Sequence, residues 1–124
     1  MSKRIILPVA ALALAASLSA TAQTSAAMPF DGVWSVLIVT DAGSCDRGYR
    51  YALRIVDGRV TYDDPSFNVS GRVDARGNVR VTVSAGGQQA SGSGRLSGDS
   101  GDGRWSGRSS TSQCSGHWEA ERRG

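Results

Sequence analysis

Apolar and polar residues alternate along most of the chain after residue 29, and no stretch there repeats with the period of a helix. The first such segment, residues 30–40 (FDGVWSVLIVT), opens with an Asp-Gly turn and continues into β-branched residues. It predicts the buried first strand of a sheet, with Trp34, Val36 and Ile38 on one face.

The clearest turn signal is the Asp-Gly dipeptide at 57–58, which lies between two alternating segments. This pattern predicts a two-residue hairpin, because glycine readily takes the positive φ that such a turn requires. The register of the hairpin would pair Ile55 with Val60 and Leu53 with Tyr62.

Turn signals recur to the end of the chain. Residues 89–96 place mainly small side chains on their inward face, and residues 98–103 (GDSGDG) predict a loop. The last segment, around Gly116 and Trp118, repeats the Gly-x-Trp spacing of the first one. Because the first and last strands of a closed sheet pair, we expect an all-β fold: a single small antiparallel barrel of about eight short strands.

The first part of the chain has a different character. Lys3 and Arg4 precede an apolar segment and then small residues, the pattern of a helical secretory signal peptide. We expect the peptide to be residues 1–22, with an alternative end at 27, and the barrel domain to be residues 28–124. The protein would then be exported, to the periplasm or out of the cell.

Charge argues against two classes of partner. The whole chain has 14 basic and 11 acidic residues, and loss of Lys3 and Arg4 with the leader leaves a net charge of only +1. Basic and acidic residues are interleaved along the remaining sequence, without the basic cluster typical of nucleic-acid binding. We therefore expect no nucleic-acid partner, and no membrane association after leader cleavage.

Two cysteines, Cys45 and Cys114, are present in the chain. In an exported protein they predict one disulfide, which would join the loop after the first strand to the start of the last strand. A redox-active pair would need the two cysteines close together in sequence, and they are not.

No catalytic or metal-binding constellation is recognisable. His117 is the only histidine, its neighbour Trp118 is expected to point inward, and no second ligand lies at metal-binding spacing. No serine lies in a nucleophile motif with a histidine and an acid. We therefore expect no enzyme, no metal and no cofactor.

One short motif carries a family resemblance. Gly32-Val33-Trp34 resembles the Gly-x-Trp signature of lipocalins and the wider calycin group. The resemblance implies a small barrel and a late arginine packed on the tryptophan, a part that Arg122 or Arg123 would take. Exported bacterial inhibitors of metalloproteases and of lysozyme have comparable barrels, and the mature sequence also looks like small exported alphaproteobacterial proteins of unassigned activity.

These observations favour a monomeric, non-catalytic binding module, such as an inhibitor or adaptor of a protein partner. We expect the contact loops to be residues 41–48, with Asp46 and Arg47, and residues 98–104, with Asp99 and Asp102. The alternative is a carrier of a small apolar or aromatic ligand inside the barrel. Five aromatic residues would either line that interior or fill it as a solid core: Trp34, Tyr51, Tyr62, Trp105 and Trp118.

Overall fold

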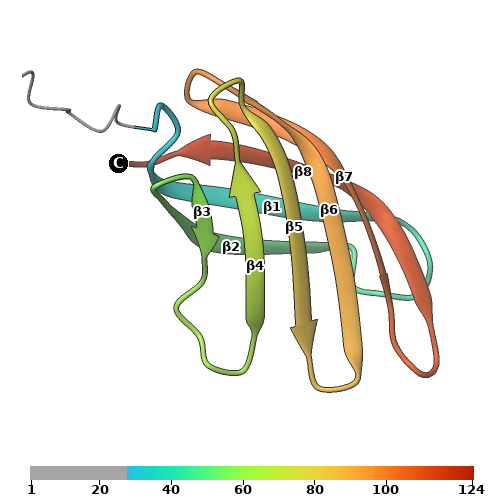
Figure 1. The fold of residues 1–124 in the computed structure, drawn as a ribbon. Coiled ribbons are helices and arrows are strands. Elements are labelled where there is room, and N and C mark those ends of the chain that lie inside the picture. Colours follow the sequence, from blue (N-terminus) through green and yellow to red (C-terminus); the bar gives the residue numbers. More distant parts are fainter. Residues whose placement is uncertain (1–27) are drawn as a thin grey trace, which may run out of the picture.

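A computed structural model describes residues 28–124, so the expected signal peptide lies outside the described residues. The described chain is an all-β domain in which eight antiparallel strands close into a barrel in sequence order, as expected (Figure 1). The last strand returns to pair with the first. The strands are β1 (Gly32–Ala42), β2 (Gly48–Val56), β3 (Arg59–Thr61), β4 (Asn68–Val73), β5 (Asn78–Ala85), β6 (Gln88–Ser97), β7 (Ser100–Arg108) and β8 (Gln113–Arg122).

The hairpin between β2 and β3 has the expected turn, but it is shorter than expected. Asp57 and Gly58 both have positive φ, 51° and 74°, and Ile55 pairs with Val60. The predicted pairing of Leu53 with Tyr62 is wrong, because β3 ends at Thr61. The chain then enters a turn around Pro65 in which the Asp64 carboxylate accepts a hydrogen bond from the amide of Ser66 (2.9 Å). Proline has no N–H to donate to a ladder, so no strand runs on through this turn.

The predicted loop at 98–104 is also wrong, because only Gly98 and Asp99 separate β6 from β7. Gly98 has a φ of +60° and makes the tight turn. The next two glycines belong to β7, where they make room for side chains. A Cβ atom on Gly101 would collide with Leu96, and one on Gly103 would lie 2.6 Å from the Trp118 ring. These glycines are required by packing rather than by a turn.

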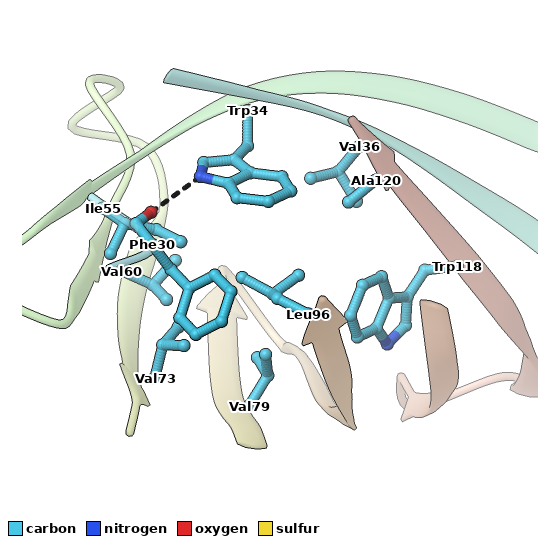
Figure 2. Close-up of a cluster of buried hydrophobic side chains, with 10 residues drawn as sticks. All are labelled: Phe30, Trp34, Val36, Ile55, Val60, Val73, Val79, Leu96, Trp118 and Ala120. Atoms are coloured by element: carbon cyan, nitrogen blue, oxygen red, sulfur yellow. Dashed lines mark hydrogen bonds between the residues drawn. The ribbon is translucent and has the colours of Figure 1, made fainter. Parts of the chain in front are cut away.

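The core gathers around two tryptophans (Figure 2). Trp34 is 1% exposed, and its indole N–H donates to the carbonyl of Phe30 at 2.9 Å. Trp118 packs over Gly94 of β6 and Gly103 of its neighbour β7, so its indole ring fills the space left by the small inward residues expected on β6. The buried cluster comprises Phe30, Trp34, Val36, Ile55, Val60, Val73, Val79, Leu96, Trp118 and Ala120.

Arg122 covers the end of the barrel at which Trp34 lies. Its guanidinium lies 5.0 Å from the centre of the Trp34 ring, where the π face attracts a cation. The same side chain donates to the Asp99 carboxylate (2.8 Å) and to the carbonyls of Asp31 (2.9 Å), Pro29 (3.0 Å) and Gly98 (3.0 Å). Of the two arginines suggested by the sequence, Arg122 is therefore the one that packs on the tryptophan.

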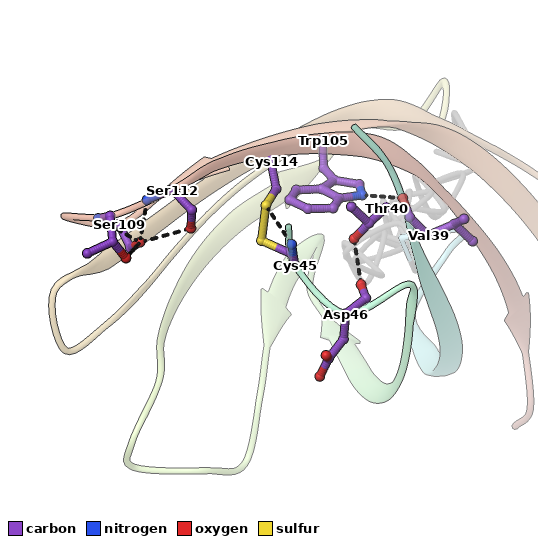
Figure 3. Close-up of a disulfide and its surroundings, with 9 residues drawn as sticks. Val39, Thr40, Cys45, Asp46, Trp105, Ser109, Ser112 and Cys114 are labelled. Atoms are coloured by element: carbon purple, nitrogen blue, oxygen red, sulfur yellow. Dashed lines mark hydrogen bonds between the residues drawn. A yellow bond between two sulfur atoms is a disulfide. The ribbon is translucent and has the colours of Figure 1, made fainter. Parts of the chain in front are cut away.

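The disulfide Cys45–Cys114 is formed as expected (Figure 3). It joins the loop between β1 and β2 to the start of β8, and its Cα atoms lie 6.1 Å apart. Two hydrogen bonds hold the same region: Thr40 Oγ1 donates to the carbonyl of Asp46 (2.7 Å), and the Trp105 indole donates to the carbonyl of Val39 (2.9 Å). The β1–β2 loop is thus fixed at both ends.

Candidate functional site

The strand pairing leaves one open edge in the barrel. Strand β3 contacts β2 only along residues 54–56 of β2, so the part of β2 before Arg54 has a strand neighbour on the β1 side alone. Strand β4 pairs with β3 only through Gly71 and Arg72, which leaves its first residues similarly uncovered on that side. Figure 1 shows that β3 is shorter than β2 and β4, and the stretch between β2 and β4 that β3 does not pair with is called the slot below.

Hairpin geometry determines which backbone groups face this slot. In a two-residue hairpin, the pair next to the turn is hydrogen-bonded, and here that pair is Val56 with Arg59. Counted back along β2 from Val56, every second residue, including Arg54, Ala52 and Arg50, therefore directs its N–H and C=O away from β1. For Arg50 and Ala52, these groups point to the side where no strand is paired with them.

Four aromatic side chains from β2 and from the segment between β3 and β4 pack together beside the slot. Tyr51 contacts Tyr62 and Phe67 edge to face, with ring centres 5.8 and 6.4 Å apart, and Tyr62 and Phe67 are 5.5 Å apart. Tyr49 stacks on Tyr51 at 6.1 Å. All four are half-buried. Burial raises the pKa of the Tyr51 hydroxyl above its ordinary value, and the neighbouring tyrosines add to the effect.

The five aromatic residues expected inside the barrel therefore form two groups. Trp34 and Trp118 belong to the core, and Trp105 packs against it, whereas Tyr51 and Tyr62 meet at the slot. Two hollows lie against the outer face of the sheet; Trp105 is among the residues that line one of them, and neither is lined by Trp34 or Trp118. The carrier hypothesis remains a prediction.

The four residues expected to form partner-contact loops do not share a surface. Asp46 and Arg47 are exposed in the loop after β1. Asp99 lies in the β6–β7 turn, beside the start of β1, where it pairs with Arg122. Asp102 is an exposed residue of strand β7, not of a loop.

His117 has an acidic partner that the sequence did not reveal. Its Nδ1 atom lies 2.8 Å from Asp41 Oδ2, and both side chains are close to half exposed. The register pairs His117 on β8 with Val39 on β1, and Asp41 lies two residues further along β1, at a bulge between Thr40 and Ala42. Within residues 28–124, no three His, Cys, Asp or Glu side chains are grouped so that they could hold a metal ion.

Arg50 and Ala52 were also missed as site residues, although the sequence carried a signal. A long alternating segment precedes the Asp-Gly turn, and Pro65 follows that turn within a few residues. A strand cut short by proline cannot cover a long partner along its whole length. The unequal lengths of the two hairpin arms thus indicate an open edge.

Comparison with models of known protein families, with curated proteins and with solved structures finds no match to this chain. A search of residues 28–124 for helices long and apolar enough to span a bilayer finds none. The function must therefore be argued from the geometry of the barrel.

Proposed function

We propose that the protein is a non-catalytic binding module that binds an extended segment of a protein partner by adding it as a strand to β2. The observation that carries this proposal is the open edge at Arg50 and Ala52, beside the aromatic group at the slot. Unpaired strand edges bind extended peptides through main-chain hydrogen bonds.

The side chains around the edge define the kind of segment that fits. The inward positions of β2 carry Tyr49 and Tyr51, and the outward positions carry Arg50 and Arg54. Side chains of an added strand would alternate between the same two faces. The complementary segment therefore alternates apolar residues with acidic ones.

This proposal makes the protein an adaptor or inhibitor, in keeping with an exported calycin-like barrel. Support for export comes from the sequence of the leader and from the Cys45–Cys114 bridge, because disulfides persist in oxidising compartments. Support for a calycin-like relationship comes from Trp34 after Gly32 and from Arg122 over its ring.

The test is selection of peptides from a displayed random library on the oxidised domain, residues 28–124. We expect selected peptides to alternate apolar and acidic residues and to bind Ala52→Pro at least about tenfold more weakly, because proline removes the edge N–H donor. The matched control is Ala52→Ser, which keeps that donor and should bind like the native domain. Ala52 is exposed and its N–H is not needed by β1, so proline is tolerated there.

Two results would overturn strand addition. The first is a selection that enriches no peptide. The second is a set of selected peptides that bind Ala52→Pro and Ala52→Ser with equal affinity.

A further inference from the structure

Four arginines from four strands line up across the outer face of the barrel. The strand registers place Arg59 opposite Arg72, and Arg72 opposite Arg80. Ser93 then separates Arg80 from Arg104. All four side chains are exposed, and they are called the arginine row below.

The arginine row has no acidic partner of its own. None of its guanidinium groups takes part in the ion pairs formed among residues 28–124. Like charges directly opposite each other on adjacent strands destabilise a sheet. Three successive arginines therefore place positive charge where folding alone would disfavour it, and an anion bound along the row would cancel the repulsion.

A row of hydroxyl groups runs parallel to the arginine row. Each member lies two residues along its strand from the position in line with the arginine row, which is Ser93 on β6 and His117 on β8, and the members pair in register across β4 to β8. Together the two rows line a hollow of about 1150 Å³ on the outer face. The hydroxyl row comprises Ser70, Thr82, Ser91, Ser106 and Ser115.

We propose that this hollow binds an acidic polysaccharide, at a surface separate from the β2 edge. Guanidinium groups match carboxylate, sulfate and phosphate oxygens with paired hydrogen bonds. Hydroxyl groups donate to and accept from sugar hydroxyls, so the two rows provide both chemistries that such a chain presents.

The side chains around the hollow also indicate which class of polyanion fits it. The two rows consist of arginine, serine and threonine, and Trp105, the aromatic residue that lines this hollow, is half-buried with its indole donating to the carbonyl of Val39, so it offers no free ring face for a nucleic-acid base. The valines that also line the hollow, Val60, Val69 and Val81, lie in or against the buried core, so they are not available to enter a lipid layer or the core of a protein interface. Adjacent strands are about 4.8 Å apart, so the row from Arg59 to Arg104 extends about 19 Å, which suits a linear chain with repeated charges.

The test is calorimetric titration of residues 28–124 with polygalacturonate, dextran sulfate and uncharged dextran. We expect binding to one or both of the charged chains and none to dextran, and the stronger of the two identifies carboxylate or sulfate as the preferred group. Arg72→Ser combined with Arg80→Ser should weaken binding at least about tenfold. Arg47→Ser combined with Arg76→Ser, which removes the same two charges from loops outside the row, should not.

Three outcomes would overturn the proposal: dextran binding as tight as that of the charged chains, unchanged binding by the double variant, or tighter binding of duplex DNA than of either glycan. Should the double variant fail to fold, Arg80→Gln alone and loss of native binding in about 1 M salt test the same contacts. Ala52→Pro should bind the glycan normally, so failure of strand addition and failure of this proposal are distinguishable.

Discussion

Replacement of Arg122 by alanine should cause a large loss of stability, because this side chain joins four separate segments. It connects the chain before β1, the β6–β7 turn, the end of β8 and the ring of Trp34. Its side chain is only 21% exposed, whereas that of its ion-pair partner Asp99 is 82% exposed. The carbonyl contacts and the ring contact therefore matter more than the ion pair.

The expected magnitude follows from those contacts. Three hydrogen bonds to the carbonyls of Pro29, Asp31 and Gly98 contribute about 1 kcal/mol each. The cation–π contact with Trp34 adds about 0.5 to 1 kcal/mol. The exposed pair with Asp99 adds little. We expect Arg122→Ala to lower the free energy of unfolding by about 3 to 4 kcal/mol.

Urea unfolding of the oxidised domain, followed by tryptophan fluorescence, measures this loss. The midpoint should fall by about 1 to 4 M for Arg122→Ala, given a urea m-value of about 1 to 3 kcal/mol/M. The control is Arg123→Ala, because Arg123 is 57% exposed and pairs only with Glu121 at the surface. It should change the free energy of unfolding by less than about 0.5 kcal/mol. Equal midpoints for the two variants would refute the assigned role of Arg122.

Two further predictions concern the disulfide and one turn. The cysteines of the bridge are 69 residues apart, so replacing both by serine should lower the free energy of unfolding by about 4 kcal/mol. A loss below about 1 kcal/mol in urea unfolding would contradict this. The Asn78 side chain and amide hold the pKa of Asp74 below the ordinary aspartate value, as do the amides of Arg76 and Gly77. Its contribution to stability should be present at neutral pH and disappear as the pH falls through that lowered pKa, whereas Asp74→Asn should lack this pH dependence. Carbon NMR titration of the carboxyl checks the shift, and a pKa at or above the ordinary value would disprove it.

Much of the fold follows from local pattern. Alternation along each strand determines which side chains face inward, and it placed Trp34, Val36 and Trp118 correctly in the core. Asp57-Gly58 determined the hairpin between β2 and β3, because positive φ at both positions is a property of that dipeptide. The matched Gly-x-Trp segments indicated that β1 and β8 pair, and the two cysteines indicated the bridge.

The wrong prediction of a loop at residues 98–104 arose because glycine has two roles in this fold. Gly101 and Gly103 read as loop residues, yet in the barrel they lie beneath Leu96 and Trp118. Local sequence cannot distinguish a glycine that turns the chain from one that admits a large ring, since the ring comes from another strand. For the same reason, local sequence did not predict the contact between Asp41 and His117, because the two residues meet only when β1 pairs with β8.

The sequence by itself determined the class of fold, the inward and outward faces of the strands, the bridge and the closure of the barrel. These depend on alternation, turn chemistry and residue type, which act over a few neighbouring positions. The sequence indicated through Pro65 that β3 covers β2 only in part, but only the tertiary structure decided which residues of β2 stay uncovered and how Arg59, Arg72, Arg80 and Arg104 come into one row. Both features depend on register between strands, because a shift of one residue would turn every arginine to the other face of the sheet.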